Sequence, residues 1–304
     1  MPDSSTALPT DPTQLAKFGK LELIARQLVE GLMMGRHRSP FKGSSVEFVE
    51  HREYYPGDEI RHIDWRAYGK TGRYYIKEFE DETNLRAHLL VDASGSMAYA
   101  GSTLSKFEYS RMLAAALSWL LLSQRDSVGM MTFDSKIREQ LKPSSNRDAF
   151  LQMTHILDQT SPGEDTSLAG VIESALPIIK RRSLLILISD CFDSLEALHA
   201  ALQRCRHAKH EVIIFRIAAP EEIDFPFERP TQFRNLENVD HRLLVDPIRL
   251  RKEYLRQYAE FSTGLEKICG AMGINQQVLK TSDPIQAVIG SWLAERMAAQ
   301  ASRR

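Results

Sequence analysis

A set of oxygen-bearing side chains, placed where apolar segments end, has the chemistry of a divalent cation site. The candidate ligands are Asp92, Ser94, Ser96, Thr166 and Asp190. The first three form a D-x-S-x-S turn after the apolar run 87–91, and the last follows the apolar run 184–188. Carboxylate and hydroxyl oxygens are the hard donors that Mg²⁺ and Mn²⁺ prefer, about six in all with several waters among them. Five such donors predict a Mg²⁺ or Mn²⁺ site with an open position, which the carboxylate of a partner protein would complete.

Each candidate ligand also has a structural alternative. Asp and Ser residues between a strand and a helix often satisfy free backbone N–H groups of that helix. Thr166 precedes an expected helix and is placed to cap it, and Asp190 is placed either to cap the helix that follows it or to hold a turn before that helix. Asp165 and Ser167 compete with Thr166 for the role of metal ligand. The residue types and spacing leave both roles open.

The segments around these residues alternate between strand and helix patterns. Short apolar runs predict strands, and longer amphipathic or apolar stretches predict helices. The expected strands are 87–91, 128–133, 184–188, 212–217 and 277–280, and the expected helices are 21–34, 106–124, 147–157, 167–179, 195–207, 248–272 and 285–297. This alternation predicts an α/β fold, a doubly wound, mostly parallel, Rossmann-like sheet with helices on both faces. Ligands bind such sheets beyond the carboxyl ends of the strands, where the candidate ligands lie.

A charge-dense segment precedes the sheet region. It contains the text R-E-Y-Y-P-G-D-E-I-R-H-I-D-W at 52–65, in which aromatic residues and turn signals are interleaved. We expect short strands and turns between 46 and 82, without a helix, so that the segment forms an N-terminal β-rich flap. Its most distinctive residues are Arg52, Asp58, Arg61, Asp64 and Trp65. They form either a partner-binding surface or a salt-bridged flap that an aromatic side chain anchors on the sheet domain, and paired charges around a tryptophan favour the structural interpretation.

Composition limits the classes of partner and location. The 304 residues carry 39 basic and 40 acidic side chains and are 43% hydrophobic, as in average globular proteins. Without a basic excess we expect neither nucleic acid nor an anionic membrane as a partner. No apolar run reaches the roughly 18 residues that a membrane-spanning helix needs, and no secretory signal pattern is found. Three widely spaced cysteines predict free thiols, so the expected location is the cytoplasm.

The candidate ligands resemble a known metal site. The D-x-S-x-S turn at Asp92, Ser94 and Ser96 is similar to the metal-ion-dependent adhesion site of von Willebrand factor A domains. Thr166 and Asp190 match the later threonine and aspartate of that site. The resemblance implies a von Willebrand factor A-like fold in which the metal joins two proteins and is not a catalyst.

Motifs on both sides of this site extend the resemblance. The 52–65 text, a K-T-G-R-Y-Y-I-K-E-F motif at 70–79 and an L-V-D motif at 244–246 resemble the domain-of-unknown-function family numbered fifty-eight. The likeness runs from about residue 35 to the C-terminal helix. It implies a bacterial protein, often encoded beside a MoxR-type AAA+ ATPase and acting as its adaptor in assembling or maturing other proteins. Some members of the family have membrane helices near the N-terminus, and since this sequence shows none we expect a soluble version.

The patterns divide the chain into three parts. A tail and helix occupy 1–34, the charged β-rich signature segment occupies 35–85, and the von Willebrand A-like domain occupies 86–297. Residues 220–246 break the strand and helix alternation and predict an insertion of loops with a hairpin. The function expected from this organisation is a non-enzymatic protein-binding adaptor, whose partner is the ATPase or its client.

The main alternative is a Mg²⁺-dependent phosphoryl hydrolase that uses Asp92 as its nucleophile. Such enzymes place a second carboxyl group two residues later as the acid and base, and Ser94 stands there instead. The turn is not a G-x-S-x-G nucleophile elbow, and the chain contains no Walker A loop. We therefore expect no catalytic residues.

Overall fold

The computed structural model of the chain describes residues 11–17, 19–36, 51–55, 63–77, 85–163, 167–229, 231–234 and 242–301. The chain divides into two compact units, one of Met1–Gly35 with Leu85–Arg304 and one of Arg36–Asn84. We treat each unit by itself.

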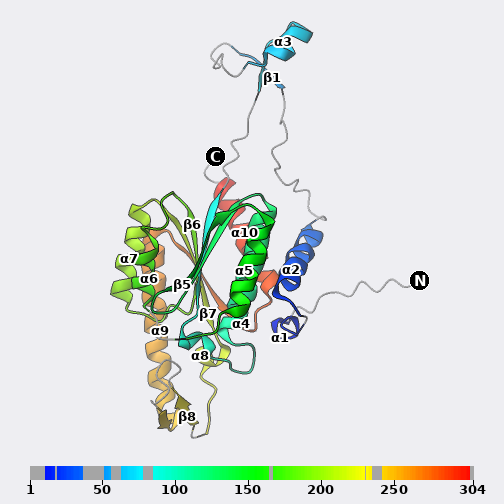
Figure 1. The fold of residues 1–304 in the computed structure, drawn as a ribbon. Helices are drawn as coiled ribbons and strands as arrows, with labels where there is room; N and C mark the ends of the chain where they lie inside the picture. Colours follow the sequence, from blue (N-terminus) through cyan, green and yellow to red (C-terminus); the bar gives the residue numbers. More distant parts are fainter. Residues whose placement is uncertain are drawn as a thin grey trace, which may run out of the picture. The chain divides into compact units, whose positions relative to one another are not determined.

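The larger unit is built around a six-stranded sheet within the described residues (Figure 1). Its strands are β3 (Arg86–Asp92), β4 (Ser127–Phe133), β5 (Ile137–Ser144), β6 (Leu184–Ser189), β7 (Glu211–Ala218) and β10 (Asn275–Lys280). They lie in the order β10-β7-β6-β3-β4-β5, and every pairing is parallel except that of β4 with β5. If the six strands are renumbered 1 to 6 along the chain, their order across the sheet from β5 to β10 is 3-2-1-4-5-6, which is the order of a doubly wound fold. The predicted α/β, mostly parallel fold is confirmed, and β5 is an edge strand that the sequence patterns did not predict.

Helices cover both faces of this sheet over two hydrophobic cores (Figure 1). One face carries α1 (Pro12–Leu15), α2 (Leu21–Arg36), α4 (Lys106–Ser123), α5 (Arg147–Gln159) and α10 (Ile285–Ala301). The other carries α6 (Leu168–Ala175), α7 (Leu195–His207) and α9 (Pro247–Met272). Successive side chains of a strand point to opposite faces, so in β3 Leu89 enters the first core and Leu90 the second. Helix α6 is shorter than expected because Pro177 follows its end closely.

The start of α4 is fixed by a capping box. The Glu108 N–H donates to Ser105 Oγ at 3.1 Å, and the Ser105 N–H donates to Glu108 Oε2 at 3.2 Å. This reciprocal pair satisfies backbone donors that have no partner inside the helix. It thereby fixes the position of Lys106, the first residue of the helix.

The segment after β7 adds a short helix and a hairpin. Helix α8 (Pro220–Asp224) follows β7 directly, and β8 (Thr231–Arg234) pairs antiparallel with β9 (Arg242–Val245). A capping interaction holds α8, because Glu222 Oε2 accepts the Ala219 N–H at 2.8 Å. Helix α8 therefore stands at the end of the sheet where the parallel strands terminate.

The smaller unit contains β1 (His51–Glu53), α3 (Trp65–Thr71) and β2 (Tyr75–Lys77), and the two strands pair antiparallel. The expectation that this segment lacks a helix is wrong, because α3 lies within it. Asp64 Oδ1 accepts the N–H groups of Arg66 and Ala67 at 2.9 and 3.1 Å, and Gly72 ends the helix with a φ of 69°. A helix of seven residues held by its two caps shows no apolar periodicity in the sequence.

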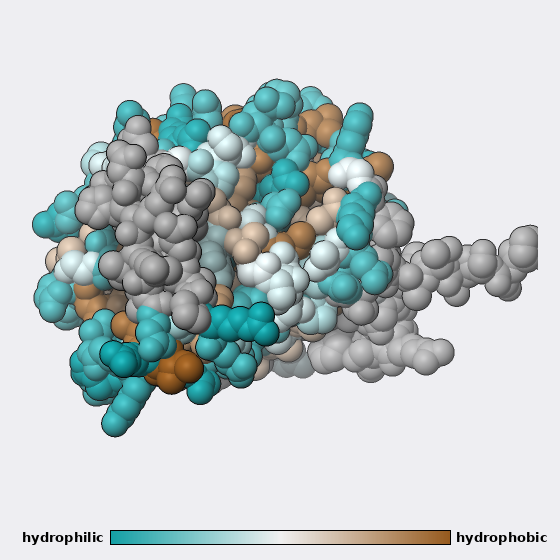
Figure 2. All heavy atoms as spheres, turned by 90° about the horizontal axis from the view of Figure 1, so that it is seen from below, coloured by the Kyte–Doolittle hydropathy of each residue, from teal (hydrophilic) through white to brown (hydrophobic). Residues whose placement is uncertain are grey.

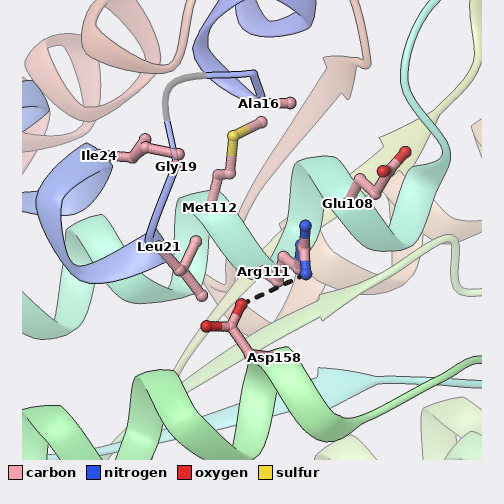
Figure 3. A pocket seen from close by; sticks show the side chains of 8 residues that line it. All are labelled: Ala16, Gly19, Leu21, Ile24, Glu108, Arg111, Met112 and Asp158. Carbon is pink, nitrogen blue, oxygen red and sulfur yellow. Dashed lines mark hydrogen bonds and ion pairs between the residues drawn. The ribbon is translucent and has the colours of Figure 1, made fainter.

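The N-terminal helices meet α4 and α5 around a small cavity (Figure 3). Leu21, Ile24 and Met112 line it, and Arg111 Nη1 lies 3.4 Å from Asp158 Oδ1 across it. Its volume of about 20 Å³ has room for little more than a water molecule. It is a gap in the packing and lies apart from the candidate ligands.

The sequence also predicts that no helix spans a membrane and that the three cysteines are free thiols. Over the parts of the chain that the structure describes, no helix combines the length and the apolar character needed to cross a bilayer. Cys191, Cys205 and Cys269 are free and buried, as their spacing predicts.

Candidate metal-binding site

The carboxyl ends of β3 and β6 bring two distant segments of the chain together. The strands pair in parallel, with Val91 opposite Ile188, so Asp92 and Asp190 lie at the same end of the sheet, where both strands terminate. Ser96 Oγ donates a hydrogen bond to Asp190 Oδ2 at 2.7 Å, and Ser94 Oγ lies 3.2 Å from Ser96 Oγ. The structure thus gathers four of the five sequence-predicted ligands at one place.

Asp92 is fully buried, and both of its carboxylate oxygens accept hydrogen bonds. The Ser94 N–H donates to Oδ1 at 2.9 Å, and the Ser189 hydroxyl donates to Oδ2 at 2.5 Å. Burial first, and the negative charge of Asp190 second, raise the pKa of Asp92 to about 7, although these hydrogen bonds lower it. A carboxylate in this environment gains free energy from a cation placed beside it.

The capping alternative does not describe the serine hydroxyls of the turn. Ser94 precedes the short 3₁₀ helix Gly95–Ala98 and makes no side-chain capping bond to it. Helix α4 is capped by Ser105, and helix α7 is capped by Ser194, whose Oγ accepts the Ala197 N–H at 3.3 Å. Asp190 is therefore not the cap of the helix that follows it.

A strained turn follows Asp190. Cys191 has a φ of 61°, in the left-handed region that non-glycine residues rarely adopt. Its N–H donates to Ser189 Oγ at 2.9 Å, and the Phe192 N–H donates to Asp190 Oδ1 at 3.2 Å. The turn holds the Asp190 carboxylate through the backbone N–H of Phe192, and Phe192 itself is 41% exposed.

Two charged residues that the sequence patterns did not single out belong to the same cluster. Lys106 is only 1% exposed, and its Nζ donates to Asp190 Oδ2 at 2.8 Å and to Glu222 Oε1 at 2.7 Å. The available sequence signal was a lysine at the start of a helix that is apolar nearly all round. No comparable signal marked Glu222, which reaches the cluster because α8 follows β7 at this end of the sheet.

Thr166 and its competitor Asp165 lie outside the described residues, whereas the segments on either side of them are described. The Gly163 N–H donates to the carbonyl of Ala93 at 2.9 Å, next to Asp92. On the other side, Ser167 caps α6 without a side-chain capping bond.

Comparison with known proteins places these observations in a family. A profile of the family described as "Protein of unknown function DUF58" matches residues 50–263, well over half of the chain. This chain belongs to the DUF58 family. An uncharacterized protein of Mycobacterium tuberculosis is 24% identical to the DUF58 chain over 298 residues, covering 97% of this chain and 91% of the relative.

Solved structures with a similar arrangement are more distant. An aerotolerance-related membrane protein of Bacteroides fragilis has a TM-score of 0.48 and 18% identity, covering 68% of the DUF58 chain and 97% of its own. The conserved hypothetical protein BatB of Bacteroides thetaiotaomicron has a TM-score of 0.43 and 18% identity, covering 69% and 98%.

The signature residues of the DUF58 chain belong to the smaller unit. Asp64 is 8% exposed and caps α3, whereas Trp65 is 59% exposed and meets the Tyr68 ring edge-on at 6.3 Å. Arg52 lies in β1, and Asp58 and Arg61 lie outside the described residues. For Asp64 the observed role is therefore structural.

The donors of the DUF58 cluster fit a hard divalent cation. Two carboxylates and two hydroxyls converge, and Mg²⁺ and Mn²⁺ favour such oxygens. The Lys106 ammonium bonds the carboxylates of Asp190 and Glu222, and Asp92 accepts its hydrogen bonds from Ser94 and Ser189 instead. The cluster therefore holds three carboxyl groups and a single ammonium. Across the described residues, no group of three or more His, Cys, Asp and Glu side chains is placed to hold a metal, so a site here depends on the serine hydroxyls.

Proposed function

We propose that this DUF58 protein is a non-enzymatic, protein-binding adaptor whose Mg²⁺ or Mn²⁺ ion grips an acidic side chain of a partner. The observation that carries the proposal is the 2.7 Å hydrogen bond from Ser96 Oγ to Asp190 Oδ2. It joins the D-x-S-x-S turn to the end of β6, so that oxygen donors from separate stretches of sequence share one centre.

Each residue of the cluster has a defined part in this proposal. A bound ion would supply the positive charge that holds a partner carboxylate. Asp92 provides a buried negative charge, Ser94 and Ser96 provide neutral oxygens, and Asp190 adds a second carboxylate. Ser189 orients Asp92 through its hydroxyl group. Thr166 remains the proposed fifth ligand.

The environment of Asp92 supports binding in preference to catalysis. Ser94 lacks the carboxyl group that a phosphoryl hydrolase of the alternative type would need. The arrangement therefore favours an adaptor over an enzyme.

The partner that we propose is a MoxR-type AAA+ ATPase or its client, in the cytoplasm. Family resemblance suggests the ATPase, and free buried thiols suit a reducing compartment. Figure 2 views the end of the molecule that lies lowest in Figure 1, where α8 is found. Hydrophilic and near-neutral residues cover most of the coloured surface there, with hydrophobic residues in small separate patches. Such a surface suits a polar contact centred on one charged group.

Capture of the ATPase tests this function. We expect the immobilised chain to retain a MoxR-type ATPase in buffer that contains Mg²⁺, and Ser96→Ala to lower retention at least about tenfold, since it removes one ligand. The measurement is the amount of ATPase eluted from each variant. A second comparison adds EDTA to the wild-type protein. Because EDTA would also remove Mg²⁺ from the ATPase, the comparison of wild type with Ser96→Ala is the decisive one.

Ser123→Ala is the matched control, because Ser123 is exposed at the end of α4 and its hydroxyl bonds only its own helix. Equal retention by wild type, Ser96→Ala and Ser123→Ala would contradict a metal-dependent grip. No retention by any of them would remove the ATPase as the partner.

A further inference from the structure

Lys106 is an unusual residue for the interior of a protein, and it touches the proposed metal site. Its side chain is 1% exposed, and its two hydrogen bonds go to carboxylates on different elements. Burial lowers the pKa of Lys106, but the negative charges of Asp190 and Glu222 outweigh it, so the pKa lies above its ordinary value. The side chain is therefore a fixed ammonium.

The ammonium shares its acceptor with the site. Asp190 Oδ2 accepts both from Lys106 Nζ at 2.8 Å and from Ser96 Oγ at 2.7 Å. A divalent ion that approaches Asp190 must share that carboxylate with the ammonium, and the two cations repel each other. Buried charges interact strongly because little water screens them.

Glu222 opposes this effect. Its Oε1 accepts from Lys106 Nζ at 2.7 Å. Its Oε2 accepts the Ala219 N–H at 2.8 Å, so the cap of α8 holds the carboxylate in place. The negative charge of Glu222 therefore offsets the positive charge that Lys106 places beside Asp190.

We infer that Lys106 and Glu222 form an opposed pair that sets how strongly the site binds a divalent cation. The Lys106 ammonium competes with the metal ion for Asp190. When no ion is bound, the ammonium holds the carboxylates of Asp190 and Glu222 together. Glu222 weakens the competition because it attracts the ammonium away from Asp190. The inference rests on the proposed function, since it concerns the same site. It predicts opposite effects for the removal of the two charges.

Calorimetric titration of Mg²⁺ and of Mn²⁺ into the full chain at about pH 8, where carboxylates are ionised, measures these effects. We expect Lys106→Met to bind the ion at least about tenfold more tightly than wild type, and Glu222→Gln at least about fivefold more weakly. Lys142→Met is the matched control, because it removes an exposed lysine from the outer strand β5, and it should stay within about twofold of wild type.

Thermal unfolding separates this role from a purely structural one. Lys106→Met is expected to lower the melting temperature in EDTA, because Asp190 and Glu222 lose their shared cation. Mg²⁺ should then raise the melting temperature of the variant more than that of wild type. A lysine that only holds the fold together would lower the melting temperature equally with and without Mg²⁺.

Each outcome decides a different claim. Tighter binding by Lys106→Met and weaker binding by Glu222→Gln support both the inference and the proposed function. Unchanged affinities, with Mg²⁺ bound by wild type, overturn the inference and keep the function. Binding by Lys106→Met alone supports the inference and overturns the function for the natural chain, and binding by none of the proteins overturns both. If Lys106→Met does not fold, Glu222→Gln decides, and equal or tighter binding by it overturns the inference.

Discussion

Asp92→Asn is expected to abolish measurable Mg²⁺ binding and, at the same time, to make the metal-free protein more stable. Asparagine keeps the shape of the side chain and an oxygen for the Ser94 N–H, but it removes a buried negative charge. We expect the affinity for Mg²⁺ to fall on the order of 100-fold, because a neutral amide is a far weaker ligand for this ion. Titration calorimetry measures the loss.

Stability is expected to rise although Mg²⁺ binding is lost, because the pKa of Asp92 is raised to about 7 in the folded chain. Because the folded pKa is raised, the unfolded chain gives up this proton first, so the stability due to the neutral carboxyl group is present below about pH 4 and is lost as the pH rises to about 7. At about pH 8 in EDTA, Asp92→Asn should therefore raise the free energy of unfolding by about 2 kcal/mol, measured by urea titration.

Asp148→Asn is the matched control, because that carboxyl group is exposed on α5. It should leave both Mg²⁺ binding and stability nearly unchanged. An Asp92→Asn variant that binds Mg²⁺ as wild type does would show that the carboxylate is not a ligand. One that loses stability as well as binding would indicate a structural role.

The second large effect that we expect is a loss of stability below neutral pH caused by His88. This residue lies in β3, is 4% exposed, and its Nδ1 has no hydrogen-bond partner among the described residues. Burial first, and then the positive charges of His210 and Arg86, lower its pKa to about 4. The ordinary value near 6.5 applies to the unfolded chain.

Because the folded pKa is lowered, the unfolded chain binds more protons between these two values. The stability due to neutral His88 is fully present above about pH 6.5 and is lost as the pH falls towards 4, by up to about 3 kcal/mol. The raised pKa of Asp92 acts in the opposite direction over the same pH range, and it does so in both wild type and His88→Leu. Urea titrations at several pH values should therefore show a less positive slope of stability against pH in His88→Leu than in wild type. His199→Leu, at an exposed position on α7, should keep the wild-type slope, and equal slopes in all three proteins would contradict the assignment.

The convergence of Asp92, Ser94, Ser96 and Asp190 could be predicted because it depends on a general property of parallel sheets. Two apolar strands that pair in parallel have their carboxyl ends on the same side of the sheet, so polar residues just after them lie close together. The apolar runs of β3 and β6 are buried throughout, which makes them easy to recognise in the sequence. The positions of these four residues follow from the local strand patterns together with the parallel pairing that an α/β sheet predicts.

The other half of the cluster could not be predicted, because it depends on tertiary structure. Lys106 follows the D-x-S-x-S turn by only ten residues, yet its partner Glu222 comes from α8, after the fifth strand of the sheet. Nothing near Glu222 in the sequence indicates a buried ion pair. Their contact exists because α8 and the start of α4 reach the same end of the sheet.

Strand β5 escaped prediction for a different reason. It is an edge strand with no buried residue, and it contains Pro143, so it shows neither an apolar run nor a clear alternation. Gly129 in the neighbouring strand was the available sign. A Cβ atom there would lie 2.9 Å from the carbonyl oxygen of Leu141, so only glycine permits this close approach of the two strands. Isolated glycines inside strands often mark such a contact.

Anomalous diffraction from a crystal grown with Mn²⁺ tests the central claim most directly. We expect an anomalous peak at about 2.0–2.3 Å from both Ser94 Oγ and Ser96 Oγ, within reach of Asp92 directly or through one water. The same map shows whether Asp190 and Lys106 stay bonded when the ion is present. A crystal whose Mn²⁺ peaks all lie away from these serines, with the cluster arranged as in the metal-free chain, would contradict the account.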